Sequence, residues 1–193
     1  MCAVTSCAKV FYSPDAFSLA HSHKIIAIIP PTVSIAARKK VDPETIKEQQ
    51  KTESLNFQKE MYSWMLKRKM QGKINTEIQD IETTNAKLMK ADYINNPVSP
   101  SELCDILGVD GVISSNYALA KPMSEGGALV VGLLVGFYGA TNEVRVSMGI
   151  HDGKTKKLIW NYDHKYSGSV GSSPARLVDG LMRNSSKKMP YVR

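Results

Sequence analysis

Residues 99–113 have the sequence Ser-Pro-Ser-Glu-Leu-Cys-Asp-Ile-Leu-Gly-Val-Asp-Gly-Val-Ile and predict a short capped helix that leads directly into a strand. Ser99 and Glu102 stand at the spacing of a capping box, in which each side chain accepts a hydrogen bond from the other residue's backbone N–H. Pro100 suits the first helical position, where its missing N–H costs nothing. Gly108 can adopt the left-handed conformation that ends a helix. A helix that runs straight into an apolar strand favours a fold in which helices pack on a sheet.

A central strand is predicted upstream, at residues 24–29. This run, Lys-Ile-Ile-Ala-Ile-Ile, has no polar alternation and ends at Pro30 and Pro31. Such a run is typical of a strand that is buried on both faces.

A long helix is predicted from Asp42 to about Gln71. Asp42 can cap the first turn, Pro43 suits the first helical position, and Gly72 can terminate the helix. Its apolar side chains recur at i, i+4, i+7 and i+8, and so form one buried stripe made of Phe57, Met61, Trp64 and Met65.

The C-terminal part of the chain predicts a β-hairpin followed by a helix. Apolar and polar side chains alternate over 143–150, so one face of that strand is packed and the other is wet. Asp152 and Gly153 predict an Asp-Gly turn between the two strands. The remaining predicted elements are a strand at 74–78, a helix at 80–90, a strand at 158–166 and a last helix that begins at Ser173-Pro174 and buries Leu177, Leu181 and Met182.

The order of these elements predicts an α/β (α+β) fold, in which a mixed sheet of about five strands packs with helices. The 193 residues suffice for one compact domain. The predicted boundaries are a remnant of a lipoprotein signal peptide at 1–6, an acylated cysteine and tether at 7–23, and a single domain at 24–193 that carries a glycine-rich insert at 126–142.

The N-terminal segment Val4-Thr5-Ser6-Cys7 resembles the site in front of which a bacterial lipoprotein signal peptidase cleaves. Cys7 would then carry diacylglycerol and a further acyl chain such as palmitate, and two or more chains make a stable membrane anchor. The residues before Cys7 lack the charged and apolar regions of a whole signal peptide. The alternative is an ordinary N-terminus that contains a cysteine.

The chain also resembles a family of envelope lipoproteins. An opening strand that ends in Pro-Pro, the capped helix leading into Leu107-Gly108-Val109-Asp110-Gly111-Val112-Ile113, and the late hairpin closed by a helix are similar to the fold group of the curli-secretion channel lipoprotein and the outer-membrane activator of penicillin-binding proteins (CsgG/LpoB-like). The resemblance implies a non-catalytic protein that binds envelope proteins, activates a synthase or assembles into rings. The longer two-stranded insertion that a curli-type channel needs is absent, which argues against pore formation.

The insert at 126–142 contains no charged residue and is rich in Gly, Leu and Val. Small residues recur in it at a spacing of four, which in a helix would place them on one face and allow another backbone to approach closely. The insert could be a locally packed helix or loop, a surface that contacts itself or a partner, or a membrane contact. The residues of this possible interaction or oligomer surface are Ala128, Gly132, Gly136 and Ala140.

The candidate catalytic residues are few. Cys104 lies within the predicted short helix and is expected in the core, and Asp110 is expected to form a turn. His21 and His23 are expected in a solvated linker, and the other two histidines, His151 and His164, in structural or surface positions. Ser169 lacks the flanking glycine of a nucleophile elbow, and no phosphate-binding glycine loop occurs. No catalytic residue, metal or cofactor is therefore predicted.

The net charge of +7 favours anionic partners such as lipid headgroups, cell-wall polymer or nucleic acid. No nucleic-acid-binding motif accompanies the charge, so nucleic acid is not expected as a partner. The basic clusters are expected to be solvated and lie at 38–40, 67–69, 154–157 and 187–188.

The sequence thus favours a non-catalytic, lipid-anchored envelope protein that binds or assembles with other envelope proteins. Further copies of the same chain are among the expected partners. Outer membrane, facing the periplasm of a Gram-negative bacterium, is the expected location, because Ala8 and Lys9 give no obvious retention signal. The alternatives are a subunit of a membrane-associated oligomer or secretion assembly, and a periplasmic hydrolase or ligand-binding protein built on Ser169, His151 and His164.

Overall fold

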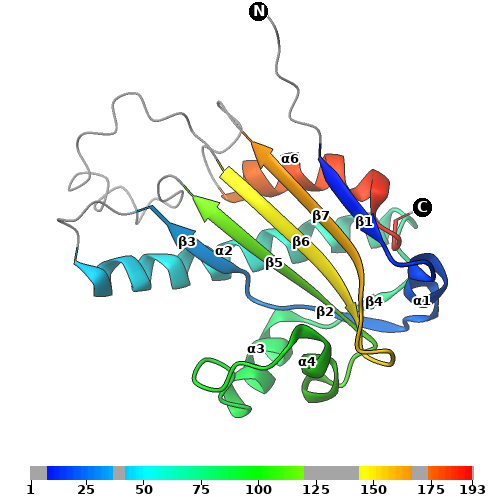
Figure 1. Ribbon diagram of the computed structural model, residues 1–193, viewed down its shortest axis with the longest axis horizontal. Helices are drawn as coiled ribbons and strands as arrows, with labels where there is room; N and C mark the ends of the chain where they lie inside the picture. The colour runs from blue at the N-terminus through cyan, green and yellow to red at the C-terminus, as the bar shows by residue number, and fades with distance from the viewer. Residues whose placement is uncertain (1–7, 37–41, 120–143, 167–173, 193) are drawn as a thin grey trace, which may run out of the picture.

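The computed structural model of the protein describes residues 8–36, 42–119, 144–166 and 174–192. They form a mixed α+β fold with one seven-stranded sheet, which confirms the predicted class (Figure 1). The sheet order is β1-β7-β6-β5-β2-β4, and β3 also pairs with β5, beyond the end of β2. The strands are β1 (Lys9–Tyr12), β2 (Ile25–Ile28), β3 (Thr32–Ile35), β4 (Glu77–Ile78), β5 (Gly111–Leu119), β6 (Val144–Asp152) and β7 (Leu158–Tyr166).

Helices lie on both faces of the sheet but cover them unequally (Figure 1). The long helix α2 (Pro43–Met70) and α6 (Pro174–Ser185) pack on one face with the main core. Two short helices, α3 (Ile81–Lys90) and α4 (Pro100–Leu107), pack on one end of the other face. Strand β2 contributes to both cores, with Ile26 and Ile28 on one side and Ala27 on the other, as its unbroken apolar run predicts.

Two of the predicted helix starts, at Asp42 and Ser99, form as expected. Asp42 accepts a hydrogen bond from the backbone N of Thr45 at 3.0 Å and begins α2. Ser99 Oγ accepts from the backbone N of Glu102 at 3.3 Å, while the Ser99 backbone N donates to Glu102 Oε2 at 2.9 Å. Gly108 ends α4 at φ 65° and ψ 46°, in the left-handed region. Local sequence chemistry therefore determines these boundaries.

Two strands were not predicted, and one of them corrects the predicted tether. Within 7–23, β1 pairs antiparallel with β7, and α1 (Ala16–Ser22) buries Ala16 and Ala20 completely. This short segment has no clear apolar periodicity, so the sequence pattern did not reveal the strand. Its structure comes instead from backbone pairing with the edge of the sheet. The other unpredicted strand, β3, follows Pro31 and continues along β5 where β2 stops.

The predicted hairpin forms, but its turn is not a two-residue Asp-Gly turn. Five residues, 153–157, connect β6 to β7, and the left-handed position is Lys156 at φ 59° rather than Gly153. Asp152 organises this loop, because its Oδ2 accepts hydrogen bonds from the backbone N and the hydroxyl of Thr155 at 2.5 and 2.6 Å.

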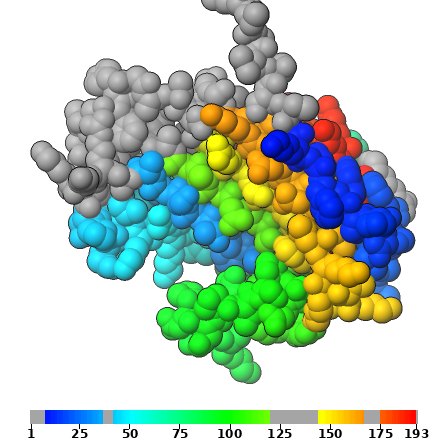
Figure 2. Space-filling model, viewed as in Figure 1, coloured from blue at the N-terminus to red at the C-terminus, as the bar shows by residue number. Residues whose placement is uncertain are grey.

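The face of the sheet opposite α2 and α6 remains largely uncovered by the described helices (Figures 1 and 2). Cross-strand partners share a face, and in this register exposed Asn116 pairs with Ser147, which pairs with Asp163, which pairs with Lys9. Their chain neighbours Tyr117, Met148 and Tyr162 belong to the core on the opposite side. We call this largely polar surface the open face; it comprises Lys9, Phe11, Thr32, Ser34, Asn116, Arg145, Ser147, Asn161, Asp163 and Lys165.

Candidate functional site

Several predicted site residues lie outside the described residues. They are the lipidation candidate Cys7, the hydrolase candidate Ser169, and the small residues of the insert, Ala128, Gly132, Gly136 and Ala140.

Cys104 is buried in α4, as predicted, and its side chain is 1% exposed. Its Sγ lies 3.8 Å from the carbonyl oxygen of Pro100 and 3.9 Å from that of His151. Burial raises the pKa of this thiol to about 11, so it is protonated near neutral pH and is not a nucleophile.

The prediction that His23 lies in a solvated linker is wrong. Its side chain is 2% exposed; Nε2 lies 2.7 Å from Asp152 Oδ1 and Nδ1 lies 2.5 Å from the hydroxyl of Tyr191. The cluster joins the end of α1, the end of β6 and the C-terminal segment. Gly111 packs against it so closely that an added Cβ would lie 2.6 Å from His23 Nδ1. Residues far apart in sequence make this site, so local pattern gave no signal for it.

The electrostatics of this cluster are those of a structural network. Burial alone would raise the pKa of Asp152, but hydrogen bonds from Thr155 and His23 outweigh it and the pKa is lowered. Burial raises the pKa of Tyr191 well above its usual range. The carboxylate of Asp152 therefore accepts a hydrogen bond from His23 Nε2, and the neutral hydroxyl of Tyr191 is hydrogen-bonded to Nδ1. All three side chains are satisfied and enclosed, so the cluster connects the ends of the fold rather than facing a substrate.

The remaining histidines do not assemble into the hydrolase site that was the predicted alternative. His151 belongs to the uncovered side of the sheet, where its Nε2 lies 3.0 Å from Ser114 Oγ. His164 lies on the opposite side, against the rings of Tyr162 and Tyr166. Burial lowers the pKa of both imidazoles, and both are neutral near pH 7. Opposite faces of one sheet cannot contribute to a single catalytic centre.

His21 is exposed beside the Phe17 ring, whereas both ring nitrogens of buried His23 are hydrogen-bonded to Asp152 and Tyr191, so the two histidines do not form a His-x-His metal pair. Within the described ranges, no group of three or more His, Cys, Asp or Glu side chains is arranged to hold a metal ion.

Asp110 does more than form a turn. Its Oδ2 accepts hydrogen bonds from the backbone N of Lys24 and of Ile25, at 2.7 and 3.0 Å. The carboxylate thus ties the start of β2 to the start of β5, the two central parallel strands.

Three exposed aromatic side chains lie near the start of the described chain. Phe11 and Phe17 are 50% and 52% exposed, and Tyr12 stacks on Phe17 with ring centres 5.4 Å apart. We call Tyr12 and Phe17 the aromatic patch; Phe11 lies on the other side of β1, on the open face. None of the helices that the structure describes is both long enough and apolar enough to span a bilayer.

Comparison with known proteins gives distant likenesses. No protein-family model and no curated protein matches the chain. Among solved structures, it is similar to lipoprotein GNA1162 from Neisseria meningitidis, with 12% identity and a TM-score of 0.48 over 85% of this chain and 96% of that one. It is also similar to the PelC dodecamer from Paraburkholderia phytofirmans, with 12% identity and a TM-score of 0.41 over 98% of this chain and 99% of that one. A third likeness is to the LpoB C-terminal domain from Salmonella enterica, with 8% identity and a TM-score of 0.35 over 74% of this chain and 82% of that one.

Proposed function

We propose that this protein is a non-catalytic lipoprotein of the Gram-negative cell envelope, held in the outer membrane by acylated Cys7 and facing the periplasm, which binds or assembles with other envelope proteins. The position of β1 supports this proposal. The strand begins at Lys9, two residues after Cys7. Because consecutive Cα atoms are about 3.8 Å apart, the acylated residue would lie within about 8 Å of the sheet edge. The anchor would hold the folded domain directly at the membrane surface.

The surroundings of that edge are suited to a membrane surface. The aromatic patch follows Cys7 within the first strand and helix. Aromatic rings partition favourably to the boundary between lipid headgroups and acyl chains. Exposed Lys9 and the net charge of +7 add attraction to anionic headgroups.

The open face is the surface that we propose for the protein partner. It presents polar and charged side chains across β1, β7, β6, β5 and β3. Obligate interfaces are more apolar than this, so the composition suits an envelope protein that binds and is released.

Labelling tests the anchor. Cells that make the full-length protein with a complete signal peptide are given radiolabelled palmitate, and membrane and soluble fractions are compared. We expect Cys7→Ser to lose the label and leave the membrane fraction, while the matched control Cys2→Ser keeps both. Continued labelling of the Cys7→Ser protein would refute the acylation site.

Site-specific crosslinking tests the surface. A photo-crosslinking amino acid is placed at Asn116 or Asn161 on the open face and, as the control, at exposed Lys59 on α2. We expect crosslinks to one envelope protein from the first two positions and not from the third. The same yield from Lys59 would show that the open face is not the interface.

Crosslinks between identical chains at Asn116 or Asn161 would favour the alternative, a subunit of a membrane-associated oligomer. The mass of the detergent-solubilised protein then distinguishes a stable oligomer from a single chain, because the mass of one chain excludes a stable assembly.

A further inference from the structure

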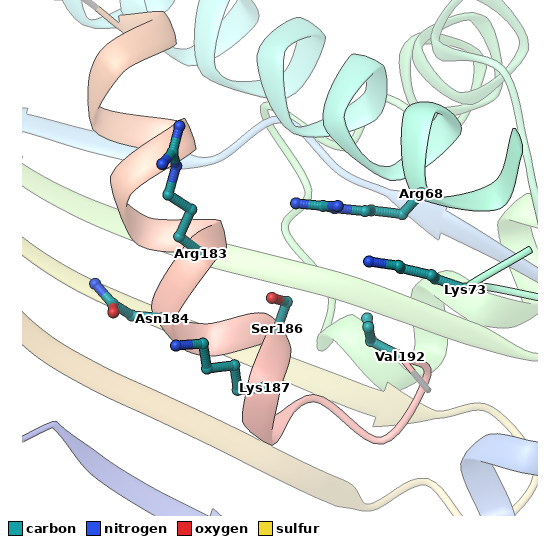
Figure 3. Close-up of a pocket in the computed structure, with 7 residues that line it drawn as sticks. All are labelled: Arg68, Lys73, Arg183, Asn184, Ser186, Lys187 and Val192. Carbon is teal, nitrogen blue, oxygen red and sulfur yellow. The ribbon is translucent and has the colours of Figure 1, made fainter. Parts of the chain in front are cut away.

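A basic cavity of about 530 Å³ lies between the end of α2 and the C-terminal segment formed by α6 and η1 (Ser186–Lys188) (Figure 3). Its volume is in the range of small-ligand sites. The polar side chains that line it are Arg68, Lys73, Arg183, Asn184, Ser186 and Lys187.

The turn after α2 brings two of these cations side by side. Gly72 adopts φ 70°, which reverses the chain, and the backbone N of Lys73 donates to the carbonyl of Arg68 at 2.9 Å. As a result, the side chains of Arg68 and Lys73 extend in parallel toward α6 (Figure 3). A local turn therefore places two like charges next to each other, which is unfavourable unless an anion lies between or beside them.

Arg68 is already held in position. Its guanidinium carbon lies 4.7 Å from the centre of the Trp64 ring, and one of its terminal nitrogens donates to Gln71 Oε1 at 2.9 Å. A guanidinium that is fixed before binding loses little side-chain freedom when it pairs with an oxyanion.

The opposite wall adds positive charge from a remote part of the chain. Packing of α6 on α2 brings Arg183 and Lys187 to the same cavity, and Ser186 contributes a hydroxyl. Arg183 uses its Nε for Asp179 at 2.8 Å. No Asp or Glu is among the described residues that line the cavity, and Asp179, which pairs with Arg183, lies outside that lining.

Helix ends often carry Lys and Arg because the helix macrodipole is negative there, and Arg68 fits that explanation. Lys73 does not, because it lies beyond the end of α2, and Lys187 lies beyond the end of α6. The cavity receives cations from the end of α2, from the turn after it and from the C-terminal segment. An anionic ligand explains this convergence better than the helix macrodipole does.

We propose that this cavity binds a phosphate group, with Arg68 and Lys73 as its main ligands and with Arg183, Lys187 and the Ser186 hydroxyl on the other side. Phosphate presents several oxygens at once, which matches the two-pronged donor geometry of Arg together with separate Lys charges. The group could belong to the headgroup of an anionic phospholipid or to a free phosphate. This site depends on neither Cys7 nor the open face, so it stands or fails separately from the proposed function.

The test uses the full chain carrying Cys7→Ser, so that acyl chains do not dominate binding. One arm titrates inorganic phosphate and follows the NMR signal of the Arg68 side chain. The other measures sedimentation with vesicles of phosphatidylglycerol, and with vesicles of phosphatidylcholine as the uncharged reference. Arg68→Gln with Lys73→Gln is compared with the charge-matched control Lys59→Gln with Lys154→Gln, whose exposed cations lie outside the cavity.

We expect the cavity variant to bind at least tenfold more weakly and the control to change less than twofold. Binding in the phosphate arm assigns a free phosphate, and binding to phosphatidylglycerol alone assigns a lipid headgroup. Arg68→Lys, which keeps the charge but loses the paired donors, should give an intermediate loss. Equal weakening in the cavity and control variants, or no binding in either arm, would overturn the proposal. Far-ultraviolet circular dichroism and thermal melting confirm that each variant is folded.

Discussion

His23 Nε2 lies 2.7 Å from Asp152 Oδ1, and this contact joins residues 129 positions apart in the chain. The same imidazole meets Tyr191, so the N-terminal segment, the end of β6 and the C-terminal segment are connected at one buried point. Residues 8–23 are consequently part of the folded domain.

The first prediction concerns this network. His23→Ala should lower the free energy of unfolding by about 3 kcal/mol, because it leaves the buried carboxylate of Asp152 without its histidine partner. His21→Ala, at an exposed position on the same helix, should change it by no more than about 0.5 kcal/mol. Urea unfolding measures both, and equal effects would contradict the structural role of His23.

The second prediction concerns the close approach of Gly111. A Cβ at this position would lie 2.6 Å from His23 Nδ1 and 2.9 Å from the hydroxyl of Tyr191. Gly111→Ala should therefore cost about 1–3 kcal/mol through overpacking. Gly72→Ala gives the comparison, because its Cβ meets nothing within 4 Å and only its positive φ is unfavourable. Thermal melting measures both variants. A smaller drop in melting temperature for Gly111→Ala than for Gly72→Ala would contradict the predicted crowding at Gly111.

The third prediction concerns pH. Burial lowers the pKa of His151 below the 6.5 of an unfolded chain, so below pH 6.5 the unfolded state binds a proton that the folded state does not. The contribution of neutral His151 to the free energy of unfolding should be fully present above pH 6.5. It should decrease as the pH drops from 6.5 toward the pKa of His151 in the folded protein. His151→Gln should reduce this slope. Urea midpoints at pH 7, 6 and 5 measure it, and an unchanged slope would contradict the burial effect.

The fourth prediction concerns Cys104. Its buried thiol, with a pKa of about 11, should react very slowly with a thiol reagent at pH 8 in the folded protein and rapidly in denaturant. The assay uses a chain that carries Cys2→Ser and Cys7→Ser, so that one thiol remains. Rapid reaction without denaturant would show that α4 does not shield it.

Amide hydrogen exchange offers the fifth prediction, on β1. If residues 9–12 pair with β7, part of their amides should exchange as slowly as those of the central strands. Fast exchange throughout this segment would support the free tether that the sequence predicted.

Local signals predicted the helices α2, α3, α4 and α6 and the central strands correctly, but they did not predict α1. The capping box at Ser99 and Glu102 and the left-handed Gly108 act over a few residues, so their outcome does not depend on the rest of the fold. The unbroken apolar run of β2 likewise indicates burial on both faces. The pattern failed for β1 and β3, which are edge or short strands, because backbone pairing with another strand stabilises them more than a periodic apolar face does.

By itself, the sequence determined the fold class, the ends of α2 and α4, and the burial of Cys104, because caps, periodicity and hydrophobicity act over short stretches of chain. Only the tertiary structure decided that His23 is enclosed with Asp152 and Tyr191, and that Arg68 and Lys73 meet cations from α6 and η1. Those groupings join segments more than a hundred residues apart. Their partners are chosen by how the helices and strands pack, which no local pattern encodes.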